Sequence, residues 1–340
     1  MSMKAQSGEK QIPRSAWNDT TAEVGVQSSI KRAFFRGERL HMGDEEYRGA
    51  VIALLDPLLR SDAGHGDLTA SALGLAEGQA GGKVLAKESG VVAGLEELEW
   101  LLKREGLAVQ LLKQDGETIE RGEVLAEITG RRGDLLVQER TGLNLLQRMS
   151  GIATMTRRLQ DQMRRGNSRT VLIATRKTPW GLLDKRSVSL GGGGTHRLGL
   201  SDAILVKNNH LALLAAREED AVVTAVERAW AGRQSAVFVE IEVRSAESAV
   251  ATAQAFRRVR AGDPASCPCV LLLDNMSPEQ ARGTMDVLKA EGLREEVLVE
   301  ISGAISESNL DEYASSGADA LSMGALTHSP RALDLSLKIS

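Results

Sequence analysis

The sequence predicts an α/β protein in which a small sandwich domain precedes a larger domain of alternating parallel strands and helices. Six short apolar runs occur between residues 171 and 323, and intervals of roughly 20 to 35 residues separate them, which suits βα units. Between residues 83 and 130 the runs are shorter, and Asp-Gly and Gly turn signals break them, as in a small sandwich. A chain of 340 residues has room for both domains.

The N-terminal third divides into a tail and the sandwich domain. Residues 1–45 are polar and aperiodic, so we expect a flexible or loosely docked extension. Helical spacing begins at Glu45 and stops near Ser61, and a loop is predicted at 64–69. Strands are predicted at 83–87, 108–112 and 123–128, and a helix at 95–104. We place the first domain at 46–143.

The pattern changes at Gln138, where a long helix is predicted over residues 138–162. The strands expected after it are 171–174, 203–206, 237–243, 270–273, 297–301 and 318–323. Their continuous apolar character is typical of parallel strands buried on both faces. We place the second domain at 144–329 and expect residues 330–340 to pack back on the first domain.

Composition excludes several classes of function. Aromatic residues make up 3% of the chain and the formal net charge is −4, which disfavours base stacking and a general nucleic-acid footprint. No stretch approaches the roughly 18 apolar residues that span a membrane, and the first 45 residues hold no secretory apolar core. Cys267 and Cys269 are expected to be reduced thiols, so we expect a cytoplasmic protein.

Each of the six predicted strands ends in a polar or glycine residue. The strand ends, in chain order, are Thr175-Arg176-Lys177, Lys207, Glu240 with Glu242, Asp274-Asn275, Ser302-Gly303 and Met323-Gly324. Parallel α/β sheets place their active sites at the carboxyl ends of the strands. The sequence therefore predicts a barrel-like mouth lined by charged groups and glycine turns.

The charges at this mouth divide by sign. The cations are Arg176, Lys177, His196, Arg197 and Lys207, residue types suited to carboxylates and phosphates. Glu242 and Asp274 suit Mg²⁺, ribose hydroxyls or a developing cation. Ser302-Gly303 and Gly324 offer backbone N–H groups to a phosphate. This set predicts a substrate with several negative charges together with a phosphorylated sugar.

Every one of these features has a plainer structural explanation. An Arg-Lys pair can be a surface feature, Asp274-Asn275 a helix cap, and a strand Glu the partner of a structural Arg. His210 and His328 are more typical of hydrogen-bonded structural histidines than of ligands. Polar chemistry at five of the six strand ends is hard to explain as scaffolding, and the conjunction favours a site.

Several blocks in a fixed order then carry a resemblance. They are Gly66 to Thr69; Glu139 to Asn144 with Met149 to Thr154; Thr175 to Thr178; Gly191 to Gly193 with His196 to Asp202; Lys207 with Asn209-His210; Glu240 to Val243; Leu273 to Asn275; Ser302-Gly303; and Gly324 to Ser329. From about residue 46 onward the chain resembles the quinolinate phosphoribosyltransferase family, also called carboxylating nicotinate-nucleotide pyrophosphorylase. The resemblance implies an N-terminal α/β sandwich followed by an incomplete barrel of about six strands.

The resemblance also implies a reaction and roles. Quinolinate and phosphoribosyl pyrophosphate would give nicotinate mononucleotide, pyrophosphate and CO₂ for NAD biosynthesis, with Mg²⁺ as cofactor. Quinolinate would be held by Thr175, Arg176, Lys177, His196, Arg197 and Lys207, with Arg140 contributed by the partner of a homodimer or larger oligomer. Phosphoribosyl pyrophosphate would be held by Lys177, Glu242, Asp274, Ser302, Gly303, Ala304, Met323, Gly324 and Ala325. Lys177, Glu242 and Asp274 would be catalytic, and Mg²⁺ would be held mainly through pyrophosphate, with Glu242 and Asp274 as candidate ligands.

The sequence departs from the family pattern at Thr195, Asn208, Ala304 and the segment around Trp180. These positions leave room for a related phosphoribosyltransferase that acts on another anionic heterocycle, such as the branch found beside molybdate-transport genes. A barrel lyase that uses Lys177 or Lys207 as a Schiff base is a second alternative. A catalytically silent relative is a third.

Overall fold

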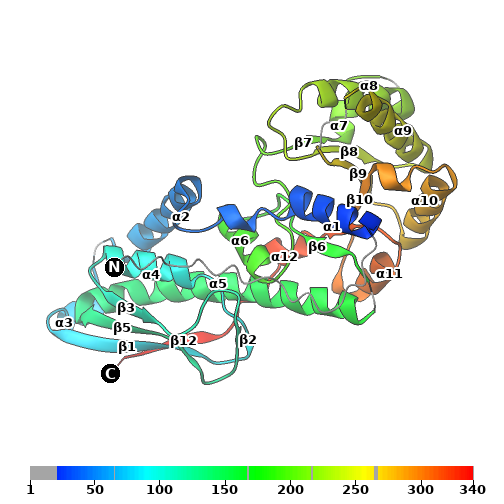
Figure 1. Ribbon diagram of the computed structural model, residues 1–340. Helices are drawn as coiled ribbons and strands as arrows, with labels where there is room; N and C mark the ends of the chain where they lie inside the picture. The colour runs from blue at the N-terminus through cyan, green and yellow to red at the C-terminus, as the bar shows by residue number, and fades with distance from the viewer. Residues whose placement is uncertain (1–20, 65, 167, 216, 264–266, 340) are drawn as a thin grey trace, which may run out of the picture.

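A computed structural model describes residues 21–64, 66–166, 168–215, 217–263 and 267–339. The N-terminal domain is built on an antiparallel sheet in the order β12-β1-β5-β3. Its strands are β1 (Gln79–Ala86), β3 (Ala108–Leu111), β5 (Val124–Arg131) and β12 (Leu335–Ile339). The short strands β2 (Gly90–Val91) and β4 (Thr118–Ile119) pair beside it. Figure 1 shows the longer helices of this domain on one side of the sheet.

Three helices bury apolar faces in this domain. They are α2 (Glu45–Ala63), α4 (Leu95–Arg104) and the first half of α5 (Arg132–Arg165), while α3 (Leu68–Ala72) is a single short turn. In α4, Leu95, Leu98 and Leu102 recur at helical spacing and are buried. Asp44 caps α2 by accepting a hydrogen bond from the Tyr47 N–H at 3.0 Å. The predicted helices at Glu45 and Leu95 are both present.

Helix α5 joins the two domains, because its 34 residues serve both cores. Leu143 and Met149 pack with the N-terminal domain, whereas Ile152 and Leu159 pack with the barrel. The domain boundary placed at residue 143 falls inside this helix. The C-terminal strand β12 pairs antiparallel with β1, so residues 335–339 lie on the N-terminal domain.

The second domain is an open parallel barrel in the strand order β6-β11-β10-β9-β8-β7. Its strands are β6 (Val171–Ile173), β7 (Ile204–Val206), β8 (Val239–Val243), β9 (Cys269–Asp274), β10 (Leu298–Ser302) and β11 (Ala320–Ser322). All five pairings are parallel, and consecutive strands β6 and β7 form the two edges of the sheet. The predicted α/β class and the incomplete six-stranded barrel are confirmed.

Helices surround this barrel and alternate with its strands along the chain. They are α6 (Leu182–Leu190), α7 (Asn208–Leu211), α8 (Glu218–Ala231), α9 (Ala246–Gly262), α10 (Pro278–Ala290), α11 (Leu310–Ala314) and α12 (Ala325–His328), with 3-10 turns at Arg294–Glu296 and Glu307–Asn309. Outward-facing strand residues such as Val239, Ile241 and Val243 pack against the helices in one large core. Within the described ranges, no helix is long and apolar enough to cross a membrane.

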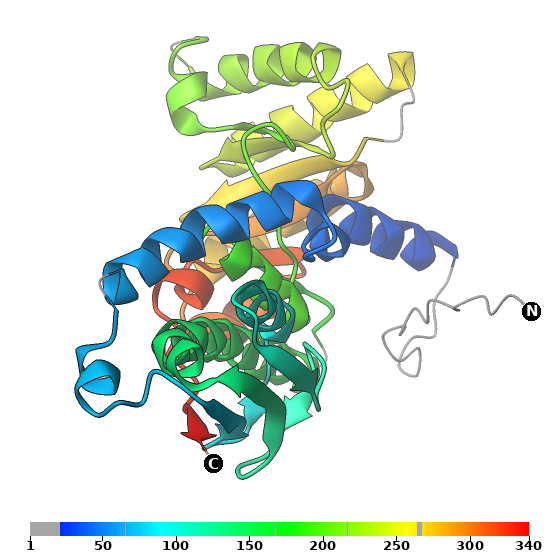
Figure 2. The ribbon, with the colours of Figure 1, turned by 90° about the vertical axis from the view of Figure 1, so that its left-hand side faces the viewer.

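The N-terminal extension differs from the expectation of a flexible or loosely docked tail. Residues Thr21–Phe34 form helix α1, and Gly37–Arg39 form a 3-10 turn, η1. Ile30, Ala33 and Phe34 are buried against barrel residues that include Leu298 of β10. Helix α1 lies beside the barrel in Figures 1 and 2. Their spacing of three and four residues is the helical signal that the polar composition concealed. The part of the extension before Thr21 lies outside the described residues.

Candidate active site

A cavity of about 570 Å³ opens at the carboxyl ends of the barrel strands. The predicted site residues that line it are Thr175, Arg176, Lys177, His196, Arg197, Lys207, Glu242, Asp274, Ser302, Gly303, Ala304, Gly324 and Ala325. Leu205, Glu300, Ser322 and His328 also line it. The structure therefore gathers side chains from all six strand ends into one cavity, as the parallel topology predicts.

Two predicted site residues lie elsewhere. Met323 is 2% exposed and packs in the core outside the barrel, so its side chain does not reach the cavity. Arg140 is exposed on the N-terminal half of α5 and is absent from the cavity lining. A role for Met323 in substrate binding is thus limited to its backbone. Arg140 would need a second copy of the chain to reach a site of this kind.

One side of the cavity is cationic. Arg176 and Lys177 follow β6, Lys207 follows β7, and Arg197 lies on the segment between α6 and β7. Arg197 is buried, and its Nη1 donates to the Ala203 carbonyl at 3.2 Å. Burial, followed by repulsion from Arg176, lowers the pKa of Arg197 below its ordinary value. A bound dianion would relieve this repulsion, so the arrangement favours a ligand with more than one carboxylate.

A buried lysine lies behind this cationic side. Lys185 on α6 is 1% exposed, and its Nζ donates to the carbonyls of Thr195 at 2.6 Å and Thr175 at 3.2 Å. Burial and then the Arg197 charge lower its pKa to about 8. Lys185 thus ties together the two loops that carry Arg176 and Arg197.

Two carboxylates, Glu242 and Asp274, also line the cavity. Asn208 contacts both of them: its backbone N–H donates to Glu242 Oε1 at 3.2 Å, and its Nδ2 lies 3.5 Å from Asp274 Oδ2. Arg244 Nε approaches Asp274 Oδ2 at 3.4 Å. Asn208, one of the departures from the family pattern, therefore helps to orient the two acids.

Adjacent strand ends carry unusual backbone angles. Gly303 has a φ of 92°, Ala304 of 50° and Asn275 of 55°. A Cβ on Gly303 would lie 2.1 Å from the Asn275 Oδ1, so only glycine fits there. Left-handed backbone at non-glycine residues is costly and gathers at functional sites. The turn after β10 is thus shaped to bring backbone close to a ligand.

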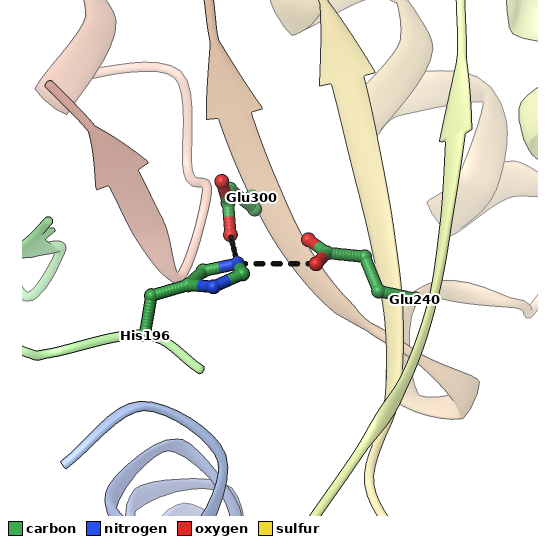
Figure 3. Close-up of side chains that lie close together, drawn as sticks. All are labelled: His196, Glu240 and Glu300. Atoms are coloured by element: carbon green, nitrogen blue, oxygen red, sulfur yellow. Dashed lines mark hydrogen bonds and ion pairs between the residues drawn. The ribbon is translucent and has the colours of Figure 1, made fainter. Parts of the chain in front are cut away.

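The floor of the cavity holds a buried cluster of one histidine and two carboxylates (Figure 3). His196 Nε2 lies 3.1 Å from Glu240 Oε2 and 3.3 Å from Glu300 Oε2. His196 Nδ1 accepts a hydrogen bond from the Arg197 N–H at 2.8 Å. Both ring nitrogens are therefore engaged within the protein. His196 also lines the cavity, so the contact with a substrate carboxylate that the resemblance implied stays a prediction.

The protonation of this cluster follows from its burial. Burial, and then Glu300, raise the pKa of Glu240 to about 7. Burial opposes ionisation of Glu300 too, but the His196 imidazole and the hydrogen bonds around it lower its pKa. For His196, burial favours the neutral ring, while the two carboxylates outweigh it and raise the pKa to about 9. The Arg197 N–H, which donates to Nδ1, opposes a second ring proton, whereas the two carboxylates at Nε2 favour it.

Glu300 is a site residue that the sequence reasoning missed. It lies at the middle of β10, level with Ala320 of β11 and Leu272 of β9. A glutamate inside a buried apolar strand was the available signal, and Glu240 in β8 shows the same pattern. His210, by contrast, is a hydrogen-bonded structural histidine, as its sequence context favoured, because its Nδ1 accepts from the Lys207 N–H at 2.9 Å. His328 lines the cavity.

Comparisons with known proteins agree with this geometry. Residues 67–150 match the family model for the quinolinate phosphoribosyl transferase N-terminal domain, and residues 152–338 match that for the C-terminal domain. A probable nicotinate-nucleotide pyrophosphorylase [carboxylating] from Methanothermobacter thermautotrophicus is 38% identical over 291 residues, which is 85% of this chain and 99% of the relative. The corresponding Bacillus subtilis protein is 33% identical over 84% of this chain and 92% of its own.

Solved structures give the same result. NadC from Streptococcus pyogenes superposes with a TM-score of 0.72 at 32% identity, covering 85% of this chain and 96% of its own. The nicotinate-nucleotide pyrophosphorylase of Francisella tularensis superposes with a TM-score of 0.72 at 28% identity, covering 86% and 96%. By its family models, its relatives and its fold, the chain belongs to the quinolinate phosphoribosyltransferase family.

Proposed function

We propose that this chain is a quinolinate phosphoribosyltransferase, which converts quinolinate and phosphoribosyl pyrophosphate to nicotinate mononucleotide, pyrophosphate and CO₂ in NAD biosynthesis. The observation that carries the proposal is the joint lining of a single cavity by cationic and acidic groups. Arg176, Lys177, Arg197 and Lys207 line it together with Glu242, Asp274 and the Gly303 turn. The cations suit a dicarboxylate, and the acids and the glycine turn suit a ribose phosphate.

The proposed chemistry gives the cations and the acids of the cavity different roles. The cations would hold both quinolinate carboxylates and so direct the ring nitrogen at the ribose carbon, which is catalysis by positioning. As pyrophosphate departs, that ribose carbon becomes positive, and Glu242 or Asp274 would stabilise the charge. The ring nitrogen is then cationic, and this charge stabilises the carbanion left when the adjacent carboxylate departs as CO₂.

The same two acids fit a magnesium ion. Glu242 and Asp274 offer hard oxygen ligands at one side of the cavity, and Mg²⁺ in such sites is held by one or two carboxylates together with substrate phosphates. Bound there with pyrophosphate, the ion would neutralise charge on the leaving group. Asn208 would keep both carboxylates in place through its backbone N–H and its amide.

We also propose a homodimer with shared sites. Arg140 is exposed and lies outside the cavity of its own chain, so a second copy is the means by which it would contact quinolinate. Cyclic twofold dimers are the commonest oligomers and would give two equivalent sites.

We propose a cytoplasmic location. Cys267 and Cys269 are free thiols, the form that a reducing cytoplasm maintains.

The test is one incubation of the purified chain with quinolinate, phosphoribosyl pyrophosphate and Mg²⁺, in which nicotinate mononucleotide and CO₂ are followed together. Both products should appear and should vanish when Mg²⁺ is chelated. Lys207→Ala should lose most of the activity, whereas Lys289→Ala, at an exposed lysine on α10, should not. Consumption of nicotinate instead of quinolinate would refute the dicarboxylate assignment. An adduct trapped by borohydride would favour a Schiff-base enzyme.

A further inference from the structure

Helix α1 holds the turn that carries His196 and Arg197. At the end of α1, the Phe34 carbonyl accepts from the His196 N–H at 3.1 Å and lies 3.1 Å from the Thr195 hydroxyl. The same hydroxyl accepts from the Arg36 N–H at 3.1 Å. Thr195 is fully buried. Three contacts therefore join the N-terminal extension to the turn between α6 and β7.

The Phe34 side chain supports the His196 ring from below. The two rings are stacked, with centroids 5.8 Å apart and an interplanar angle of 21°. Phe238, from the segment before β8, meets the His196 ring edge-on at 5.1 Å. Phe34 is fully buried in an apolar layer that includes Ile173, Val270 and Leu298 from three barrel strands. The cavity floor thus rests on an apolar layer to which α1 contributes.

The backbone of the turn requires such support. His196 has a φ of 53°, a left-handed conformation that is unfavourable for a residue with a Cβ. Strain of this kind persists only where the surroundings over-determine it. The neighbouring Gly194 is packed so closely that an added Cβ would lie 3.0 Å from the Phe34 carbonyl oxygen. The end of α1 is therefore one of the elements that hold this turn in its strained form.

Two features place this support outside the matched family models and the family pattern. Helix α1 lies before residue 67, where the match to the family models begins. Thr195, one of the sequence departures from the family pattern, is the residue whose hydroxyl contacts Phe34 and Arg36. The extension and the departure from the family pattern thus meet in one set of hydrogen bonds.

We propose that α1 is a built-in support of the quinolinate pocket, in which Phe34 and Thr195 are positioning residues for Arg197. The inference rests on the proposed function. Arg197 follows His196 directly, and its N–H is bound to the His196 ring, so a shift of that ring moves Arg197 in the cavity. Glu242 and Asp274, which are assigned to the phosphoribosyl substrate, are instead contacted by Asn208 and Arg244.

The experiment compares full-length variants in steady-state assays, with quinolinate and phosphoribosyl pyrophosphate varied in turn. Phe34→Ala should raise the KM for quinolinate by about tenfold or more, since small misplacements of a binding group are costly. The KM for phosphoribosyl pyrophosphate should stay within about twofold. Phe34→Leu, which keeps an apolar side chain, should restore part of the loss. Lys31→Ala, at an exposed position of the same helix, is the matched control.

If Phe34→Ala does not fold, Thr195→Val tests the inference in its place, because it removes one hydroxyl and keeps the side-chain shape. It should also raise the KM for quinolinate selectively. Unchanged KM values, or equal changes for both substrates, would overturn the inference and leave α1 a purely structural element. A wild-type protein that consumes no quinolinate refutes the proposed function and this inference together, whereas an active wild type with unaltered variants refutes only the inference.

Discussion

The buried ion pair between Arg148 and Asp184 offers a quantitative test of how the cavity is held together. Arg148 on α5 donates from Nε and Nη2 to the two carboxylate oxygens of Asp184 on α6, each at 2.9 Å. Nη2 also donates to the Thr327 carbonyl at 2.9 Å, and Asp184 Oδ2 accepts from the Trp180 N–H at 3.0 Å. The Thr327 hydroxyl in turn donates to the Lys177 carbonyl at 2.7 Å. Asp184 therefore connects α5 to loops that border the cavity.

Asp184→Asn removes the negative charge and leaves the shape nearly unchanged. The Asp184 side chain is fully buried, and breaking one partner of a buried pair costs about 3–5 kcal/mol. The Arg148 side chain is 22% exposed, so water partly screens the charge left behind. We therefore expect the free energy of unfolding to fall by about 2–4 kcal/mol, which corresponds to a loss of roughly 3 to 6 °C in Tm for a 340-residue chain.

A second bidentate pair on the same helix supplies the control. Arg158 on α5 binds both carboxylate oxygens of Glu307, one of them at 2.8 Å, but its side chain is 50% exposed and that of Glu307 is 53% exposed. Exposed pairs contribute about 0–1 kcal/mol, so Glu307→Gln should change stability by less than about 1 kcal/mol. Thermal and denaturant unfolding of both variants measure the comparison. Equal losses for the two variants, or a loss under about 1 kcal/mol for Asp184→Asn, would refute the reasoning from burial.

Three further predictions concern the site. Arg140→Ala and Lys207→Ala should each be inactive, yet a mixture of the two should recover about one quarter of wild-type activity. Random mixing makes half of the dimers mixed, and each mixed dimer keeps one of its two sites intact. No recovery in verified mixed dimers would exclude a site shared between subunits. Gly303→Ala, whose Cβ would meet Asn275 Oδ1 at 2.1 Å, should raise the KM for phosphoribosyl pyrophosphate at least about tenfold and spare that for quinolinate. The raised pKa of Glu240, about 7 against an ordinary 4.5, means that the folded state binds an extra proton between these values. Its contribution to stability is thus complete below about pH 4.5 and is lost as the pH rises through 7, by about 3 kcal/mol. Chemical unfolding at pH 5 and pH 8 should therefore show a larger loss in the wild type than in Glu240→Gln.

The secondary structure was largely accessible from local pattern. The six parallel strands and the helices at Glu45 and Leu95 follow from apolar periodicity and turn residues, which act over a few positions. The extension was misjudged because its polar composition outweighed three apolar residues, Ile30, Ala33 and Phe34, at helical spacing. A short amphipathic helix of this kind is stabilised by packing against the barrel, and that packing is not a local property.

Some features of the site likewise follow from local sequence, whereas others depend on the fold. The sequence by itself determined which residues line the cavity at the strand ends, since parallel strands deliver their carboxyl ends to one edge. Only the tertiary structure decided that His196 is bound to Glu240 and Glu300, that Met323 faces the outer core, and that Arg140 lies outside the cavity. Residue spacing fixes the direction of a side chain relative to its own strand or helix. Which other element it then meets depends on how segments far apart in the chain pack together, and that is decided by the fold as a whole.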